Sequence, residues 1–214
     1  TLHTLFPYTT LFRSILARST LSEWIGRYGF ALQPLADRLA ELLRQRLILH
    51  ADETPVQQLD PGKGKTKRAY LWAYRSNDLD EGPGLAVFDY QTGRSGAHAR
   101  AFLDGWKGHL VVDDYAGYKA LFGLGVTEVG CMAHARRKFF ELHAANQSPV
   151  AAEALRRIAE LYEIEGRGSK LDTEQRQQLR AQEADPKLQS LHDWLQSTRQ
   201  GRSEEHTSEL QSPS

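Results

Sequence analysis

Cysteine is nearly absent from this chain of 214 residues, which contains Cys131 and no other. A single cysteine excludes an internal disulfide and a zinc site built from several cysteines, and it fits a reducing compartment. An excess of one charge is missing too, because 27 lysines and arginines face 27 aspartates and glutamates. No apolar run approaches the roughly 18 residues of a membrane span, and no secretory signal opens the chain. These absences predict a globular protein without a membrane partner, although zero net charge says nothing about local basic patches.

The two ends of the chain differ from its interior. Residues 4–14 resemble the translation of a short-read sequencing adapter, and residues 202–212 resemble that of its partner adapter. The alternative is a polar, Ser/Thr-rich tail at each end. Because adapter sequence is not selected to pack with a protein, we expect residues 1–14 and 202–214 to be non-native. The native part is then about 15–201, and we expect both natural ends to be missing.

Helical periodicity marks the segment 15–46. Leu21, Trp24, Ile25 and Tyr28 follow the spacing of one helix face. Ser19 or Thr20 can cap this helix, Gly29 can end it, and Pro34 suits the first turn of a second helix. The pattern therefore predicts two helices in an N-terminal helical segment.

From residue 47 onward the pattern predicts an α/β fold. Apolar or alternating runs indicate strands over 47–52, 69–75, 85–90, 109–113 and 126–131, and helical patterns cover 95–106, 115–122 and 133–145. The order βββαβαβα implies an antiparallel meander followed by parallel crossovers, and so a mixed sheet. We place the core at 47–146 and a helical segment at 147–201. The polar helices expected over 173–184 and 186–198 suit a surface or a hairpin better than a core.

Two aspartates end apolar strands of this pattern. Asp52 ends the first predicted strand and Asp113 ends the fourth. Burying a carboxylate at such a position is costly unless it is paired or bound to a cation. Because the first and fourth strands can lie side by side, the two acids can meet and hold Mg²⁺ or Mn²⁺. The alternative is two surface carboxylates that cap the turns after their strands.

Several short motifs resemble the insertion sequence sixty-six family of bacterial DDE transposases. The segment 51–56 (ADETPV) resembles its first acidic motif, and 112–118 (VDDYAGY) resembles its second, with Asp114 in place of the usual glycine. Further resemblance lies in 61–65 with Trp72, in 88–90 with 94–96, in 131–139 and in 161–165. Met132 stands where the family usually shows tryptophan. The resemblance covers essentially all of residues 15–201, in the right order.

This resemblance implies a ribonuclease-H-like core that cuts and joins DNA at transposon ends with divalent metals. It implies Asp52 and Asp113 as metal ligands, a metal-activated water as nucleophile, and an oligomer as the full-length active complex. Its partners would be transposon-end and target DNA in the bacterial cytoplasm, at the nucleoid. The family's third acid, a glutamate in an Asn-Asn-x-x-Glu-Arg stretch, has no counterpart in this sequence. Glu141 and Glu165 are weak substitutes, and we expect truncation to have removed the true residue.

Basic residues gather at two places that could contact DNA. One is the turn with Lys63, Lys65, Lys67 and Arg68. The other is the start of the predicted helix over 133–145, with His134, Arg136, Arg137 and Lys138. Amides at a helix N-terminus and basic side chains suit a DNA phosphate, whereas the alternative at the helix is a solvated basic face.

The sequence thus favours a truncated DDE transposase that is inactive as written, because its third acid is missing. Two other functions stay open: a catalytically dead DNA-binding fragment of the same lineage, or a metal-dependent nuclease on the same fold.

Overall fold

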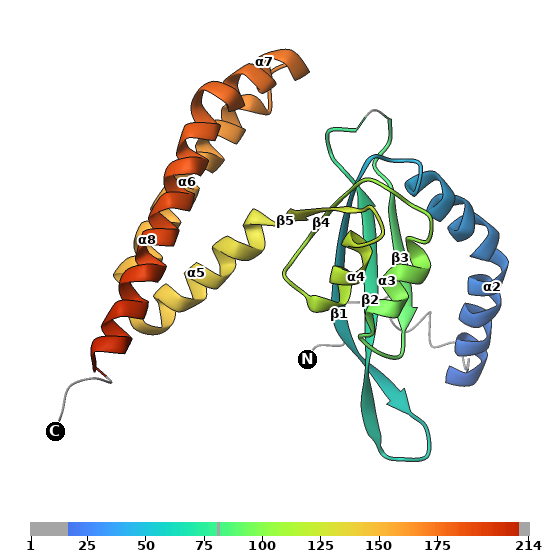
Figure 1. The fold of residues 1–214 in the computed structure, drawn as a ribbon. Coiled ribbons are helices and arrows are strands. Elements are labelled where there is room, and N and C mark those ends of the chain that lie inside the picture. Colours follow the sequence, from blue (N-terminus) through green and yellow to red (C-terminus); the bar gives the residue numbers. More distant parts are fainter. Residues whose placement is uncertain (1–16, 81, 210–214) are drawn as a thin grey trace, which may run out of the picture. The chain divides into compact units, whose positions relative to one another are not determined.

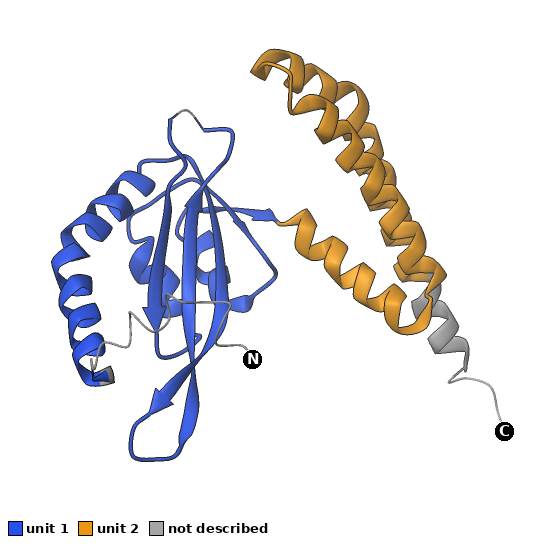
Figure 2. Cartoon of the chain, turned by 180° about the vertical axis from the view of Figure 1, so that it is seen from behind, with its two compact units in different colours: residues 1–130 blue, residues 131–214 orange. Residues whose placement is uncertain are grey.

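The computed structural model describes residues 17–80 and 82–209. The chain divides into two compact units, residues 1–130 and residues 131–214 (Figure 2). The first unit holds a sheet with its helices, and the second is helical. Residues 1–16 and 210–214 lie outside the described part, so the expectation about the adapter-like ends is open there.

The first unit begins with one long helix, α2 (Arg18–Leu43), and the prediction of two helices is wrong. Gly29 and Pro34 both lie inside α2, and its N-cap is Ala17, without a side-chain cap. Pro34 cannot donate to the carbonyl of Phe30, but this stretch is exposed, so water can satisfy that carbonyl. The predicted apolar face of this helix is largely exposed, with Ile25 at 72% and Tyr28 at 68%.

A five-stranded mixed sheet forms the centre of the first unit (Figure 1). Its strands are β1 (Ile48–Asp60), β2 (Lys65–Ser76), β3 (Ala86–Gln91), β4 (His109–Val112) and β5 (Thr127–Gly130). They lie side by side in the order β3-β2-β1-β4-β5. Strands β1, β2 and β3 are antiparallel, whereas β4 is parallel to both β1 and β5. The predicted α/β class and mixed sheet are therefore confirmed.

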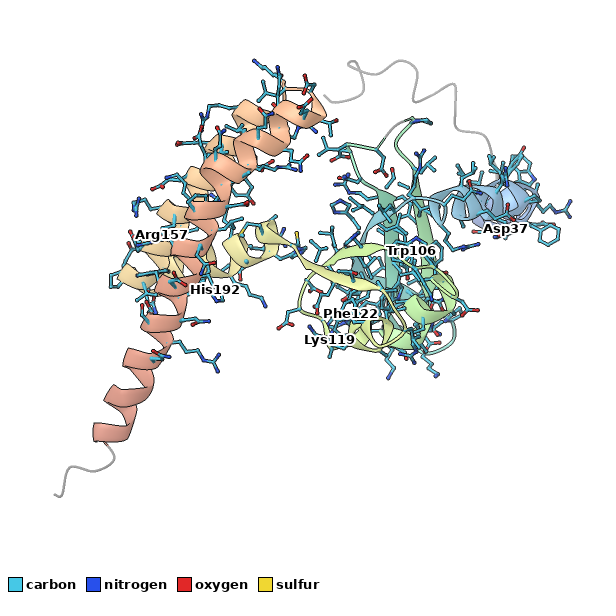
Figure 3. All side chains as sticks on the ribbon, turned by 45° about the horizontal axis from the view of Figure 1, so that its top comes forward. Asp37, Trp106, Lys119, Phe122, Arg157 and His192 are labelled. Carbon is cyan, nitrogen blue, oxygen red and sulfur yellow. The ribbon has the colours of Figure 1, made fainter. Side chains whose placement is uncertain are left out.

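Short helices connect the later strands. They are α3 (Gly96–Phe102), the 3₁₀ turn η2 (Ala116–Tyr118) and α4 (Lys119–Phe122). Ser95 caps α3, since its side chain accepts a hydrogen bond from Ala97 N. A buried core includes Trp72, Tyr74 and Tyr118, so these aromatic side chains pack inside the sheet unit. Trp106, labelled in Figure 3, donates Nε1–H to the carbonyl of Arg46 at 2.9 Å.

Strands β1 and β2 are longer than the sequence predicts. Their pairing runs from Leu49 opposite Ser76 to Asp60 opposite Lys65, whereas β3 pairs only with residues 70–75 of β2. The outer half of the hairpin is therefore a two-stranded ribbon, which Figure 1 shows extending past the other strands. Gly62 (φ 84°) and Gly64 (φ 62°) supply the positive φ angles of its turn.

The second unit is helical. Its elements are α5 (Met132–Asn146), α6 (Pro149–Gly168), α7 (Thr173–Leu179), the π-helical turn η3 (Arg180–Ala184) and α8 (Asp185–Glu209). The last three form one unbroken helical run, so the prediction of separate helices over 173–184 and 186–198 is wrong. Helix α8 packs against α6 around a small core with Ile158, Leu161 and Leu191, so the hairpin is formed by α6 and α8. Arg157, labelled in Figure 3, lies 5.0 Å from the ring centre of Trp194 and donates to Ser190 Oγ at 3.0 Å.

Two boundaries differ from those expected. Helix α5 groups with the helical unit because it packs against α6, whereas the range 47–146 assigned it to the core. Helix α8 continues past residue 201 to Glu209, into the adapter-like segment, although the side chains of 201–209 are not described. No helix of the described residues has the length and hydrophobicity needed to cross a membrane.

Acidification is expected to destabilise the helical unit. Hydrogen bonds from Arg156 and Arg157 lower the pKa of Glu153 from 4.5 to about 2. Ion pairs with basic residues likewise lower the pKa values of Glu160, Glu165 and Glu183. A lowered folded-state pKa contributes stability above the unfolded-state value of about 4.5, and that stability is lost as pH falls toward 2. Thermal unfolding followed by circular dichroism should therefore show a lower unfolding temperature at pH 3 than at pH 6.

In a Glu153→Gln variant, the difference between the unfolding temperatures at the two pH values should be smaller. Equal unfolding temperatures of the unchanged chain at pH 3 and pH 6 would contradict the prediction.

Candidate active site

Asp52 lies on β1, and Asp113 directly follows β4, the neighbouring parallel strand. The register pairs Ile48 with His109 and His50 with Val111. Asp52 and Asp113 each follow that last pair by two residues, so the register places them at matching positions. The predicted adjacency of the two strands is therefore confirmed. One detail differs, because β1 does not end at Asp52 but continues, paired with β2, after it has separated from β4.

Both aspartates are available to a ligand. Asp52 is exposed and Asp113 is partly exposed. Each accepts one hydrogen bond from nearby backbone, from Glu53 N to Asp52 Oδ1 and from Tyr115 N to Asp113 Oδ1, both at 3.0 Å. No described lysine or arginine forms an ion pair with either of them. Asp113 interacts electrostatically with Arg94 without forming an ion pair with it. Two accessible carboxylates of this kind are a donor set that fits a hard divalent cation.

The described residues bring no third ligand to this pair. Across residues 17–80 and 82–209, no group of three or more His, Cys, Asp and Glu could hold a metal ion. Both weak candidates lie in the helical unit. Glu165 is bound by Arg180 through two hydrogen bonds, at 2.8 and 2.6 Å. Glu141 is exposed and lies on α5.

Glu53 is buried, although it adjoins Asp52. Side chains alternate across a strand, so Glu53 points into the core face, where its side chain is 1% exposed. Arg94 donates to Glu53 Oε1 from both Nε, at 2.8 Å, and a terminal nitrogen. The hydroxyl of Tyr118 donates to Glu53 Oε2 at 2.7 Å. These donors compensate a buried carboxylate that would otherwise cost several kcal/mol.

Arg94 also contacts the segment that follows Asp113. Its guanidinium carbon lies 3.9 Å from the ring centre of Tyr115, and its carbonyl accepts a hydrogen bond from the Tyr115 hydroxyl. Burial lowers the pKa of Arg94, but the hydrogen bond and charge of Glu53 outweigh it, so the pKa is raised and the guanidinium stays charged. Burial raises the pKa of Tyr118, and the hydrogen bond to Glu53 adds to this, so the phenol remains a donor.

Sequence reasoning did not assign roles to Glu53, Arg94 or Tyr118. Two signals were available. An acid at the position before or after an exposed strand acid must face the core, and a buried acid needs a partner. The segment 94–96 was also one of the motifs that resemble the transposase family, but its sequence assigned no chemical role to Arg94. Asp114 points elsewhere, as its side chain is 79% exposed and forms an ion pair with Lys119 at 3.1 Å.

The basic residues of the first cluster lie on the ribbon of β1 and β2. Lys63, Lys65, Lys67 and Arg68 are all exposed. Lys63 forms an ion pair with Asp60 at 3.3 Å. The other three form no ion pair with any described residue, which leaves their charges available to a polyanion.

The basic residues of the second cluster lie on α5 in the helical unit. Arg136, Arg137 and Lys138 are exposed and form no ion pair within the described part of the chain. Arg156, Arg157, Arg167 and Arg180 of the same unit all pair with glutamates. His134 is half-buried, and its Nδ1 has no hydrogen-bond partner in the described part. A groove of about 730 Å³ runs past Arg136, Arg137 and the exposed rings of Phe140 and Tyr162.

Comparison with known proteins gives one family. A model described as "Transposase IS66 family" matches residues 11–212. That range includes parts of both adapter-like ends. No solved structure matches the chain.

Three uncharacterised proteins of Sinorhizobium fredii (strain NBRC 101917 / NGR234) are similar. Protein y4qI is 35% identical over 187 residues, which is 82% of this chain and 35% of y4qI. Protein y4jD is 34% identical over 186 residues, 82% of this chain and 36% of the relative. Protein y4hP is 32% identical over 202 residues, 84% of this chain and 36% of the relative. The chain thus spans about a third of the length of the curated relatives it matches.

Proposed function

Because the chain belongs to the Transposase IS66 family, we propose that it is the part of a DNA transposase that carries two acids of a DDE-type active site. Asp52 and Asp113 are these acids, and they hold Mg²⁺ or Mn²⁺. The substrate is a phosphodiester at a transposon end, in the bacterial cytoplasm at the nucleoid. The active enzyme is an oligomer that also binds target DNA.

One observation carries this proposal: two accessible acids each stand two residues beyond the last paired residues of the adjacent parallel strands β1 and β4, Asp52 within β1 and Asp113 just after β4. A divalent cation held between such acids activates water and stabilises the leaving oxygen of a phosphodiester. The protein's own contribution is to fix both carboxylates on one sheet. The order of strands, with three antiparallel strands followed by a helix and a parallel strand, agrees with a ribonuclease-H-like core.

Metal binding by the two aspartates tests the proposal. Mn²⁺ is titrated into the chain, and free Mn²⁺ is followed by electron paramagnetic resonance. Asp52→Asn and Asp113→Asn should each weaken binding at least about tenfold, the loss that even indirect partners of a metal commonly cause. Asp114→Asn is the matched control, since it removes the same charge from the neighbouring position. Unchanged binding in Asp52→Asn, or an equal loss in Asp114→Asn, would overturn the assignment.

The two basic clusters supply the DNA contacts of this proposal. A two-stranded ribbon fits the major groove of DNA, and on the β1–β2 ribbon Lys65, Lys67 and Arg68 form no ion pair with a described residue. On α5, Arg136, Arg137 and Lys138 likewise form none within the described ranges. Lysines and arginines that neutralise phosphates release counterions, which makes binding depend on salt.

Loss of one unpaired arginine should weaken DNA binding and its salt dependence together. For Arg136→Ala, the slope of log affinity against log salt should fall by about 1. Fluorescence anisotropy with a labelled DNA duplex measures this slope. Arg167→Ala is the control, because Arg167 lies in the same unit but pairs with Glu183 at 3.0 Å. Equal slopes for Arg136→Ala and the unchanged chain would exclude a phosphate contact at Arg136.

A further inference from the structure

Three chain segments meet next to the two aspartates, and we call their meeting point the junction. It consists of Glu53 on β1, residues 94–96 at the start of α3, and residues 115–118 at η2. Two of these segments bear the acids, since Glu53 follows Asp52 directly and Tyr115 is two residues beyond Asp113. We infer that Arg94 and Glu53 are positioning residues, which hold the two acid-bearing segments in the register that a shared cation requires. This inference rests on the proposed function.

Arg94 contacts both segments at once. Its guanidinium binds the buried carboxylate of Glu53 and stacks on the ring of Tyr115. The backbone carbonyl of Arg94 accepts a hydrogen bond from the hydroxyl of Tyr115. A planar guanidinium can form a two-nitrogen contact and stack at the same time, whereas the ammonium of lysine cannot.

The junction continues into the hydrogen bonds of the acids themselves. Tyr115, held by Arg94 through its ring and hydroxyl, donates its backbone N–H to Asp113 Oδ1 at 3.0 Å. Glu53, held by Arg94 and Tyr118, donates its backbone N–H to Asp52 Oδ1 at 3.0 Å. Each acid is thus oriented by the amide of a residue that Arg94 contacts. These two amides report directly on the arrangement.

Backbone packing supports the same arrangement. Gly96 lies so close to Gly117 that a Cβ on Gly96 would be 2.7 Å from Gly117 Cα. Gly96 and Gly117 therefore bring the two segments into direct backbone contact. A buried salt bridge is weak evidence for stability by itself, and its placement between the two acid-bearing segments favours a positioning role here.

The test compares Arg94→Lys and Glu53→Gln with a core variant that leaves the junction intact. Val126→Ala serves as that control, because Val126 is 4% exposed in the same core but is not part of the junction. Arg94→Lys and Glu53→Gln should each weaken Mn²⁺ binding roughly tenfold, as loss of outer partners of a metal site does. The double variant should be no weaker than the worse single variant, because the two residues act as one unit. Val126→Ala should lower the unfolding temperature and leave Mn²⁺ affinity unchanged.

A second readout needs no metal. In ¹H–¹⁵N spectra of the metal-free chain, Arg94→Lys should shift the amide signals of Tyr115 and of residue 53, whereas Val126→Ala should leave both in place. Arg94 is 43% exposed in its side chain, so its conservative replacement is compatible with folding. If Arg94→Lys moves neither amide and keeps the original Mn²⁺ affinity while Asp52→Asn loses it, the positioning role is refuted and the proposed function stands. If Asp52→Asn also keeps the original affinity, the proposed function itself has failed.

Discussion

Gly96→Ala is expected to destabilise the sheet unit strongly. The added Cβ would lie 2.7 Å from Gly117 Cα and 2.8 Å from its carbonyl carbon, and closer still to the carbonyl oxygen. All three are backbone atoms of Gly117, so the clash cannot be relieved by the rotation of a side chain. Overpacking of this kind costs about 3 kcal/mol, which corresponds to a fall of roughly 10 °C in unfolding temperature for a unit of this size. Thermal unfolding followed by tryptophan fluorescence measures it.

Gly93→Ala is the matched control for this substitution. It adds the same methyl group three residues earlier, where nothing lies within 4 Å and φ is not positive. Its stability should stay within about 0.5 kcal/mol of the original, as for other changes away from packed features. Similar unfolding temperatures for Gly93→Ala and Gly96→Ala would show that segments 94–96 and 115–118 are not in close contact in solution.

Much of the sheet could be predicted because strand patterns are local. Apolar and alternating runs identified all five strands, and the helix between the third and fourth implied a parallel pair. Strand length was underestimated in β1 and β2, since the outer ribbon has polar residues on both sides and its pairing depends on the partner strand. The N-terminal helix was divided wrongly because Gly29 and Pro34 are strong local stop signals. An exposed helix tolerates both residues when water can satisfy the freed carbonyl.

The candidate site could be predicted in part, for a similar reason. A carboxylate at the end of an apolar run is visible in a single sequence, so Asp52 and Asp113 stood out. The Glu53–Arg94 pair was not visible, since its members are 41 residues apart and meet only when β1 and the start of α3 pack together. The pKa shifts of Arg94 and Tyr118 depend on the same packing, because it places both side chains beside Glu53, and local sequence does not encode it.

Metal-dependent strand transfer is expected to be undetectable with this chain, even with the correct transposon-end DNA. Asp52 and Asp113 supply ligands from two neighbouring strands, and no third His, Cys, Asp or Glu among the described residues completes a metal-binding group with them. Two-metal phosphodiester chemistry needs ligands that place a cation at both the attacking and the leaving oxygen. With two carboxylates, a cation keeps most of its water and binds weakly. With these two acids and no third ligand among the described residues, the chain is expected to bind DNA without joining it.

A chimera tests this expectation from the other side. Joining residues 15–201 to the remaining sequence of y4qI, at the positions where the two align, should produce Mg²⁺-dependent strand transfer. Asp52→Asn in that chimera should abolish the activity again, whereas Asp114→Asn should preserve it. Cleavage without joining by the chimera would indicate a nuclease, and DNA binding without either reaction would indicate a catalytically dead lineage.

Robust Mg²⁺-dependent cleavage by the chain alone would contradict the prediction. It would direct attention to Glu141 and Glu165, and Glu141→Gln and Glu165→Gln would then identify the third acid by loss of that cleavage. Glu165 is already held by Arg180 through two hydrogen bonds, whereas no ion pair with a described residue holds Glu141.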